Sequence, residues 1–342
     1  MRILVTGGAG FVGSHVVDAL VALDHEVVVL DSLVAHGGVR PPWWRRDVET
    51  HVGDVRDPRT WDVAARGVDA VCHQAARVGL GVDFSDVRAY VDDNDAGTAS
   101  GLWALHHLGF RGRIVLASSM VVYGEGWYRC AQHGRQRPGP RRSDDLAAGR
   151  YEPLCQACGT ALVWERIDES APVDPRNTYA ATKVHQEHLC AVFGREHGSA
   201  VTALRYHNVY GPRCPAGTPY AGVASLFRAA VERGERPTVY EDGGQTRDFV
   251  HVRDVARANV LALTRDEPYD GPLNVASGTP RTVLDLAAAA CAGSGLDPEV
   301  VGGGRLGDVR HVVASPRRAV DVLGFVASEP FGLDPRREVG AR

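Results

Sequence analysis

The sequence predicts an α/β protein whose main body is a doubly wound parallel sheet, with a smaller mixed α/β domain and a metal-binding insert. Three observations support this prediction. Strand-like and helix-like segments alternate from the first residues onward, which is typical of parallel strands joined by right-handed crossovers. A glycine-rich turn follows the first strand-like segment. Two close pairs of cysteine and histidine residues interrupt the alternation.

The expected elements follow in order along the chain. Short runs rich in valine, isoleucine and leucine predict buried strands at 2–6, 26–30, 68–72, 113–117 and 201–205. Apolar residues at helical spacing predict helices at 14–23, 89–108, 179–197, about 222–233, 252–263 and 282–291. Segments 125–172 and 211–247 are expected to be rich in loops. Residues 331–342 carry little apolar material and are expected to form a partly disordered tail.

The composition limits the class of protein. The chain has 342 residues, of which 44% are hydrophobic and 23% charged, as in ordinary globular proteins. A net charge of −4 gives no reason to expect nucleic-acid or anionic-membrane binding. Neither a signal-peptide pattern nor a run of ~18 apolar residues is present, so a cytoplasmic protein is expected. Seven cysteines, an odd number, argue against a disulfide framework.

The glycine-rich turn has the pattern of a dinucleotide-binding loop. Residues 7–13 read GGAGFVG, with glycines at Gly7, Gly10 and Gly13. Such a turn lets backbone N–H groups approach a pyrophosphate and lets the next helix pack on the strand. Asp31 ends the second strand, where a carboxylate binds the ribose 2′-OH of NAD and repels the extra phosphate of NADP. The alternative is that Asp31 is an ordinary surface residue.

Further motifs resemble a known family. GDVRD at 53–57 and HQAA at 73–76 follow the glycine turn, and their order and spacing resemble those of extended short-chain dehydrogenase/reductases. The resemblance covers roughly residues 1–325, apart from the insert, and implies a Rossmann fold in which Asp54 meets the adenine. The NAD-binding residues expected from motif and resemblance together are Gly7, Gly10, Phe11, Val12, Gly13, Asp31, Asp54, Val55, Ala75, Ala76, Tyr179 and Lys183.

A serine, a tyrosine and a lysine are the expected catalytic residues. Tyr179 and Lys183 are four residues apart on a predicted helix and so share a face. A tyrosine base needs its pKa lowered from about 10, which a nearby ammonium and a nicotinamide cation can do. The tyrosine–lysine pair alone occurs often by chance. Ser119, however, ends a predicted strand, and the resemblance implies that it binds the sugar oxygen that is oxidised.

The expected substrate residues follow from the same resemblance. LRYHNVYGP at 204–212 contains Asn208, which is expected to contact a nucleotide diphosphate, and His207, which stands where many family members have phenylalanine. Arg247 lies in QTRDFVHV and Arg310 in GDVR. Two arginines can clamp a diphosphate with forked hydrogen bonds. The alternative is that each arginine pairs with a carboxylate.

The residues after Ser119 favour one reaction. The resemblance implies that a tyrosinate removes the sugar 4-OH proton while C4 gives hydride to NAD. Related 4,6-dehydratases then use an Asp-Glu pair, and decarboxylating relatives a glutamate, where this chain has Met120 and Val121. The expected reaction is therefore 4-epimerisation of a nucleotide-linked sugar. A dehydrogenase or ketoreductase, a 4,6-dehydratase and a non-catalytic NAD-sensing protein are the alternatives.

The insert carries a predicted zinc site. Cys130 and His133 form one x2 pair, Cys155 and Cys158 another, with 21 residues between the pairs. Three thiolates and an imidazole in this pattern predict a closed, structural, zinc-ribbon-like site, whose metal would supply folding energy. A Cys155–Cys158 disulfide or free thiols are the alternatives. The insert resembles one in some bacterial sequences assigned as dTDP-L-rhamnose 4-epimerases, which favours a dTDP-sugar over a UDP-sugar.

The resemblance also implies an organisation in domains and a homodimer. Family members usually pair through the helices that match 89–108 and 179–197. The NAD-binding domain is expected at 1–128, 160–210 and 250–277, the zinc-binding insert at 129–159, the nucleotide-sugar-binding domain at 211–249 and 278–330, and the tail at 331–342.

Overall fold

The main domain is a seven-stranded parallel sheet between two layers of helices. The computed structural model describes residues 1–79, 83–215, 222–304 and 307–333. The strand order is β13-β9-β5-β4-β1-β2-β3, and every described pairing is parallel. The strands are β1 (Arg2–Thr6), β2 (Glu26–Asp31), β3 (Glu49–Val52), β4 (Ala70–His73), β5 (Arg113–Ser119), β9 (Val201–Tyr206) and β13 (Gly271–Val275).

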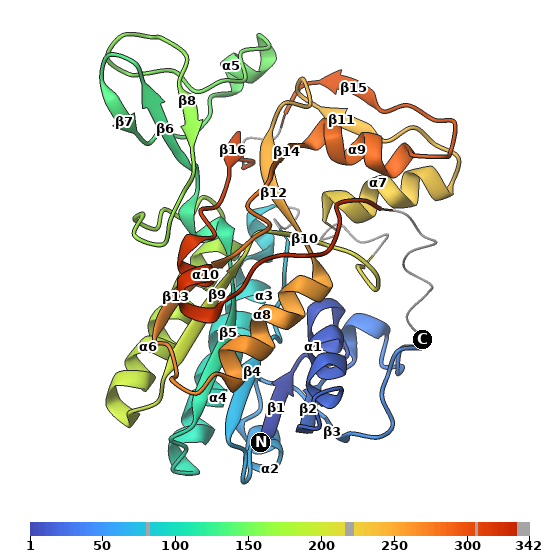
Figure 1. The fold of residues 1–342 in the computed structure, drawn as a ribbon, viewed down its shortest axis with the longest axis vertical. Coiled ribbons are helices and arrows are strands. Elements are labelled where there is room, and N and C mark those ends of the chain that lie inside the picture. Colours follow the sequence, from blue (N-terminus) through green and yellow to red (C-terminus); the bar gives the residue numbers. More distant parts are fainter. Residues whose placement is uncertain (80–82, 216–221, 305–306, 334–342) are drawn as a thin grey trace.

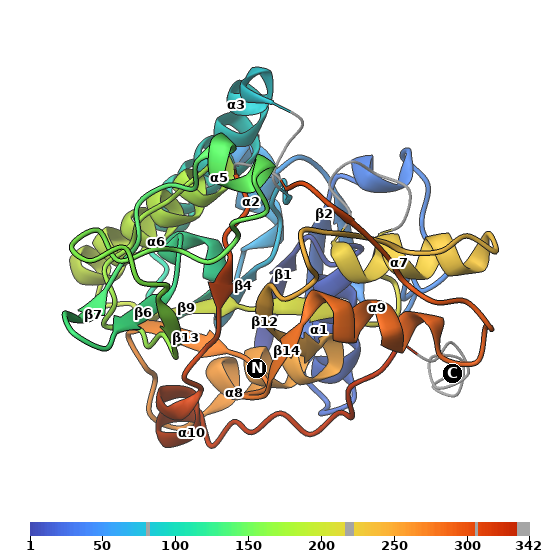
Figure 2. The same cartoon turned by 90° about the horizontal axis from the view of Figure 1, so that it is seen from above.

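Both faces of this sheet are buried. Ile3 and Val5 of β1 belong to the apolar cluster under α1 (Phe11–Val21) and α8 (Val252–Thr264), whereas Leu4 belongs to the cluster on the other face. This alternation is the two-residue period of a strand. Figure 2 shows α1 and α8 on one side of the strands and α6 on the other. That second layer consists of α2 (Pro58–Ala64), α3 (Val87–Tyr90), α4 (Gly97–His107) and α6 (Thr178–His197).

A smaller mixed α/β domain stands on the carboxyl ends of the parallel strands (Figure 1). The elements are β10 (Asn208–Tyr210), α7 (Val223–Glu232), β11 (Thr238–Tyr240), β12 (Thr246–His251), β14 (Pro280–Thr282), α9 (Val283–Cys291), β15 (Glu299–Gly302) and β16 (His311–Val312). Its core packs two helices, α7 and α9, against buried side chains of the strands, among them Tyr210 and Phe249. The chain then returns to the main domain through α10 (Arg317–Leu323).

The insert has its own small antiparallel sheet. Strands β6 (Trp127–Cys130), β7 (Gly134–Gln136) and β8 (Val163–Glu165) pair in the order β7-β6-β8, and α5 (Ser143–Ala147) follows β7 along the chain. Figure 1 shows this unit projecting from the body above β16. Its strands have only three or four residues, which is too short for a period to be recognised in the sequence.

Most expected strands and helices are present, with three differences. The helix expected at 89–108 is broken by a π-helical stretch, Val91–Ala96. Segment 125–172, expected to be loop-rich, contains the insert's sheet and α5. The tail expected from residue 331 begins in ordered structure, because Phe331 and Leu333 pack in the core of the smaller domain. Residues 334–342 lie outside the described residues. None of the described helices is long and apolar enough to cross a membrane.

Candidate functional site

The glycine turn between β1 and α1 has no room for side chains. Gly7 has a φ of +68°, and a Cβ on it would lie 2.8 Å from the Ala75 nitrogen. A Cβ on Gly13 would lie 2.1 Å from the Gly7 carbonyl oxygen. Gly10 caps α1 without any side-chain hydrogen bond to the helix start. A tight turn that ends at a helix N-terminus is the cradle that a dinucleotide pyrophosphate requires.

Asp31 is fixed at the edge of this turn. One carboxylate oxygen accepts a hydrogen bond from the Ala9 N–H at 2.9 Å and the other from the Leu33 N–H at 2.7 Å. Two side chains that the sequence did not single out, His36 and Trp43, lie within 3.0 and 2.9 Å of the Ala9 carbonyl oxygen. Their only signal in the sequence is their place in the loop after β2. The turn therefore has a rigid border beside a fixed carboxylate, at the expected ribose site.

The remaining expected cofactor residues lie along the same edge. Ala75, next to Ala76 in the 73–76 segment, contacts Gly7 and donates its N–H to the Thr6 hydroxyl at 3.2 Å. Val55 packs 3.0 Å from the position of a Cβ on Gly97. Asp54 pairs with Arg56, whose guanidinium lowers the pKa of that carboxyl. Asp54 therefore stabilises its own turn, and this role is compatible with the expected contact to adenine.

The structure brings Ser119, Tyr179 and Lys183 together at the carboxyl end of β5. Tyr179 stands in the first turn of α6, which Asn177 caps by accepting the Ala180 N–H at 2.8 Å. Ser119 is close enough to the Tyr179 phenol for hydrogen bonding to lower the pKa of that phenol. Lys183 donates from Nζ to the Ala117 carbonyl at 2.8 Å, and its Nζ lies 5.8 Å from the Tyr179 ring centre. The helix and the strand together fix all three groups.

Burial acts on both ionisable groups of this set. It raises the pKa of the Tyr179 phenol above its usual value, an effect that the hydrogen bond with Ser119 opposes. Burial also lowers the pKa of the Lys183 ammonium to about 8. Tyrosinate at neutral pH therefore requires additional positive charge next to the phenol. A bound nicotinamide ring would provide that charge, which fits the placement of this set beside the glycine turn.

A buried polar network behind α6 was not predicted. Asn94, in the π-helical stretch, is fully buried. Its amide donates to the Thr182 hydroxyl at 2.9 Å and to the Arg77 carbonyl at 3.0 Å. Thr98, one turn later, accepts from Gln186 at 2.6 Å. These bonds join α4 to α6 and hold the helix that carries Tyr179. A polar residue on the buried face of a predicted helix is a weak signal by itself.

Two of the expected substrate residues lie on one face of the smaller domain's sheet. Asn208 pairs with Phe249 in parallel register, and Arg247 is two residues before Phe249, so Asn208 and Arg247 point to the same side. The Asn208 side-chain oxygen is buried without a partner among the described residues. The Arg247 guanidinium donates to the Thr246, Arg310 and Val309 carbonyls at 3.0, 2.8 and 2.5 Å. No ion pair to a carboxylate is found for this guanidinium in the described part of the chain, although the negative charges of Asp308 and Glu125 act on it.

Arg310 does not have the free guanidinium that a diphosphate clamp would need. Its side chain is 3% exposed and forms ion pairs with Glu152 at 2.6 Å, Glu241 at 2.9 Å and Asp242 at 2.8 Å. Of the two alternatives for this arginine, the structure therefore shows the pairing with carboxylates, and these belong to the insert and to the end of β11. A direct forked contact from Arg310 to a diphosphate would require these carboxylates to move away.

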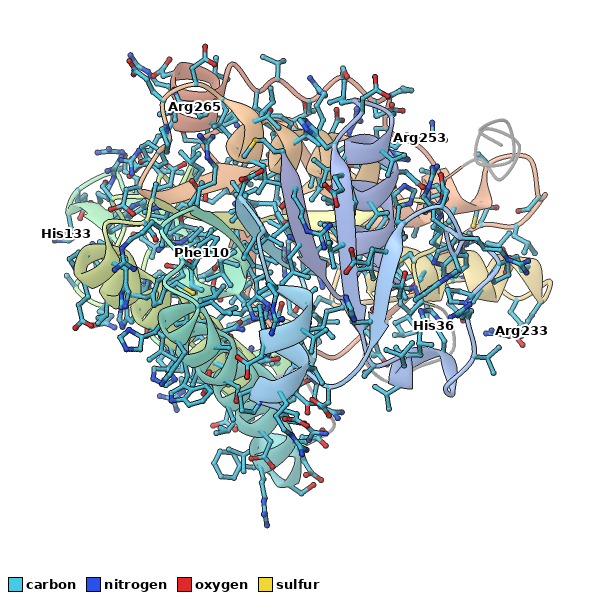
Figure 3. All side chains as sticks on the ribbon, turned by 90° about the horizontal axis from the view of Figure 1, so that it is seen from below. His36, Phe110, His133, Arg233, Arg253 and Arg265 are labelled. Atoms are coloured by element: carbon cyan, nitrogen blue, oxygen red, sulfur yellow. The ribbon has the colours of Figure 1, made fainter. Side chains whose placement is uncertain are left out.

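The four expected metal ligands form a cluster in the insert. The Cys130 sulfur lies 3.5 Å from His133 Nδ1 and 3.6 Å from the Cys158 sulfur, and the Cys155 sulfur lies 3.5 Å from His133 Nδ1. All four ligand atoms lie within 4.8 Å of one another, as around a tetrahedral zinc with bonds of about 2.0–2.3 Å. No disulfide joins Cys155 to Cys158. In Figure 3, His133 and His36 lie at opposite edges of the molecule, so the cluster is remote from the glycine turn.

Comparisons with known proteins agree with this arrangement. A sequence profile described as the NAD dependent epimerase/dehydratase family matches residues 3–145 and 157–276. A dTDP-L-rhamnose 4-epimerase of Burkholderia thailandensis is 33% identical over 331 residues, covering 95% of this chain and 90% of that protein. A UDP-glucose 4-epimerase of Thermus thermophilus, solved with NAD, superposes with a TM-score of 0.76 at 31% identity, covering 97% of this chain and 95% of the other.

A second solved structure extends this similarity. It is a UDP-glucose 4-epimerase of Thermotoga maritima, solved with UDP-glucose. It superposes with a TM-score of 0.78 at 27% identity and covers 96% of this chain and 94% of the other. Among curated proteins, a putative UDP-glucose 4-epimerase of Methanocaldococcus jannaschii is 30% identical over 288 residues, 83% of this chain and 79% of that protein.

Proposed function

Because the chain belongs to the NAD-dependent epimerase/dehydratase family, and is therefore an enzyme, we propose that it is an isomerase that inverts C4 of a nucleotide-linked sugar. The observation that carries this proposal is the set Ser119–Tyr179–Lys183, with no acid or base at the two positions that follow Ser119. Met120 is buried in an apolar cluster with Val122. Neither Met120 nor Val121 can move a proton, so the eliminations of dehydratases and decarboxylases have no obvious catalyst here.

The chain's own residues account for each proton step. NAD, when bound, supplies the acceptor for the C4 hydride and a positive ring beside the phenol. Tyr179 removes the proton of the sugar 4-OH, and Ser119 holds the same oxygen through a hydrogen bond. The Lys183 ammonium, fixed on Ala117, favours the tyrosinate. Once the 4-keto sugar has rotated to present its opposite face to the cofactor site, Tyr179 would return the proton to the same oxygen.

Binding is divided between the two domains. The glycine turn and Asp31 hold NAD in preference to NADP, because the carboxylate is fixed where a 2′-phosphate would stand. The expected cofactor contacts are Gly7, Gly10, Phe11, Val12, Gly13, Asp31, Asp54, Val55, Ala75 and Ala76. Asn208 and Arg247 face the diphosphate. The similarity to a dTDP-L-rhamnose 4-epimerase favours a dTDP-deoxysugar, with a UDP-sugar as the next candidate.

The decisive experiment offers purified protein a panel of dTDP- and UDP-sugars and follows the configuration at C4 by NMR. An epimerase gives a mixture of both C4 epimers without added NAD, because the cofactor is regenerated in each turnover. Product that forms only with stoichiometric NAD or NADH would instead identify a dehydrogenase or ketoreductase. Loss of the 6-hydroxyl would identify a 4,6-dehydratase. No turnover of any sugar by NAD-loaded protein would favour a non-catalytic, NAD-sensing role.

We also propose that Cys130, His133, Cys155 and Cys158 hold one structural zinc ion. The four ligand atoms are at tetrahedral separations, and a full set of protein ligands leaves no open position for substrate. Metal analysis of protein purified without added zinc should find close to one equivalent per chain. Well under half an equivalent, with no change of protease sensitivity in Cys155→Ser, would contradict this site.

A homodimer through α3, α4 and α6 is the proposed assembly. Trp103 and Val192 on these helices are 52% and 46% exposed, so both are accessible to a partner subunit. Sedimentation velocity should give twice the chain mass, and Trp103→Glu should give the single-chain mass. The domain boundaries predicted from the sequence are also part of this proposal, except that β8 goes with the insert, β10 with the smaller domain and α10 with the main domain. Limited proteolysis between residues 129 and 159 would test them.

A further inference from the structure

Both halves of the metal cluster present a side chain to His311 of the smaller domain, and one of these side chains also binds Arg310. Tyr128, two residues before Cys130, accepts the His311 N–H at 3.0 Å. Glu152, three residues before Cys155, accepts from Arg310 Nη2 at 2.6 Å with one oxygen. Its other oxygen lies 2.9 Å from His311 Nε2. The insert therefore contacts β16 through the bases of both metal-binding turns.

The contacts continue to Arg247. His311 Nδ1 accepts the Thr246 N–H at 3.0 Å, so the ring proton is on Nε2 and is donated to Glu152. The Arg247 guanidinium in turn donates to the carbonyls of residues 309 and 310. Any shift of the 309–311 backbone therefore moves the acceptors that aim this guanidinium. From the insert side, Tyr128 accepts the backbone N–H of His311, and Glu152 holds the side chains of Arg310 and His311.

The insert depends on the metal cluster to present these two groups. Its buried apolar cluster consists of Tyr128, Cys130, Cys155 and Leu162, so two of the four members are metal ligands. The Cys155 turn is closed by backbone bonds at 2.8 Å from the Cys155 N–H to Thr160 and from the Leu162 N–H to Pro153. Without a metal, three thiols and an imidazole would remain in a core too small to order itself.

We propose that the metal-bearing insert is a positioning device for the substrate diphosphate. The metal fixes Tyr128 and Glu152, these fix residues 309–311, and that segment aims Arg247 at the diphosphate. Tyr128 and Glu152 are proposed as positioning residues, because each acts through the 309–311 segment. The inference rests on the proposed function, in which Arg247 binds a nucleotide-sugar diphosphate. It predicts that the insert controls nucleotide affinity and leaves the proton and hydride steps at Ser119 and Tyr179 unaffected.

The test measures binding of dTDP and UDP, which carry the diphosphate without the sugar, to NAD-loaded protein by calorimetry. Glu152→Ala should weaken the tighter of the two by about tenfold or more, the loss expected when a charged hydrogen bond no longer positions its partner. Glu165→Ala is the matched control. Glu165 is also an insert carboxylate paired with two arginines, Arg129 and Arg135, but it does not contact β16, and its variant should bind within twofold of wild type.

Two further measurements separate positioning from general damage. In Glu152→Ala, NAD content and turnover at saturating substrate should match wild type, while KM rises. In an Arg247→Ala background, Glu152→Ala should cost less than a further twofold, because the residue through which it acts is gone. Metal-free protein, obtained by chelation or as Cys155→Ser, should show the same loss of nucleotide affinity as Glu152→Ala.

The outcomes distinguish this inference from the proposed function. Wild-type protein that binds neither dTDP nor UDP would overturn the proposed function and the inference with it. Wild-type binding that Glu152→Ala leaves within twofold would overturn the inference alone. The inference alone is also overturned if Glu152→Ala weakens binding equally with and without Arg247, or if it lowers saturated turnover as much as affinity.

Discussion

Tyr179 enters the site as a buried phenol whose pKa is raised by desolvation and lowered by its hydrogen bond with Ser119. Lys183 supplies the positive charge of the three-residue set, but burial lowers the pKa of its ammonium to about 8. As the pH rises through 8, the ammonium loses its proton and with it the support that it gives to the tyrosinate. The positive charge of the site is therefore most complete below pH 8.

Tyr179→Phe removes the proposed base and keeps the ring. Turnover should fall by about 10²–10⁴-fold, the usual contribution of a positioned general base. Nucleotide affinity and NAD content should change little, because the aromatic ring and Lys183 remain. Initial rates and bound NAD, measured on the same preparation, test this expectation. Turnover within threefold of wild type would exclude Tyr179 as the base.

The ion pairs of Arg310 lead to a prediction about stability. Arg310→Leu would remove the cation between three carboxylates, of which Glu241 is 2% exposed. Unpairing a buried charge costs several kcal/mol, and Arg141, which also pairs with Glu241, keeps part of the compensation, so we expect a loss of about 3 kcal/mol. Urea unfolding measures it. Arg129→Ala, which breaks an exposed pair, should cost under about 1 kcal/mol, and equal losses would contradict the buried network.

Spacing within one helix or one turn made some of these residues predictable. Tyr179 and Lys183 are four residues apart, and the metal ligands come in two x2 pairs, so local geometry fixes their neighbours. The partners of Arg310 were not predictable in this way. Glu152 and Glu241 are 158 and 69 residues distant from it along the chain, and only the fold brings them together. For this reason the sequence predicted that Arg310 helps to clamp a diphosphate, whereas in the structure it pairs with three carboxylates.

The close packing of β1, the glycine turn and α1 predicts that a larger residue in the turn abolishes NAD binding. In Gly13→Ala the new Cβ would lie 2.1 Å from the Gly7 carbonyl oxygen, so either the turn opens or the helix moves away from the strand. NAD should be lost during purification. In Gly139→Ala, where the nearest atom to a Cβ is 3.6 Å away on a flexible side chain, NAD should be retained. Mass spectrometry of the acid-released cofactor decides, and NAD in Gly13→Ala at wild-type level would refute this account.

Elements with a long, regular pattern were predictable, and interrupted ones were not. Five of the seven parallel strands follow from runs of apolar residues, and the long helix α6 from apolar residues at helical spacing, whereas β3 and β13 were not predicted. The π-helical stretch Val91–Ala96 reads VDDNDA, with four polar residues in succession and no apolar period, so the sequence does not show which of them turns inward. The insert's strands were missed because their order comes from cross-strand pairing and metal ligands instead of from a local apolar period.

The whole molecule carries buried histidines that resist protonation. Burial lowers the pKa of His73 to about 3 and those of His15 and His207 to about 4. In the unfolded chain a histidine titrates near 6.5. As the pH falls from about 6.5 towards 4, the unfolded state therefore takes up protons that the folded state excludes. Stability should fall by about 1.4 kcal/mol per pH unit for each such histidine, and should not change on this account above pH 7.

His207→Phe tests this dependence with the residue that many family members have at this position. The decrease of the unfolding free energy between pH 6 and pH 5 should be smaller by about 1.4 kcal/mol than in wild type, because one proton fewer is taken up. Urea titrations at the two pH values measure it. His107→Asn, a change of an exposed histidine, is the control. Identical slopes for His207→Phe and wild type would contradict the assignment.

Ser119 and Tyr179 belong to segments about sixty residues apart, and the insert fills most of that interval. In polymer terms the insert is a loop whose ends must meet for the catalytic pair to form. The cost of closure grows with the logarithm of loop length, so crosslinking residues 130 to 158, which halves the free length, lowers it by only about 0.6 kcal/mol. A chain with the insert replaced by a short linker should therefore still close its main sheet. It would lose the contact with β16. The side chains at the base of the insert therefore matter more for function than the length of the loop does for folding.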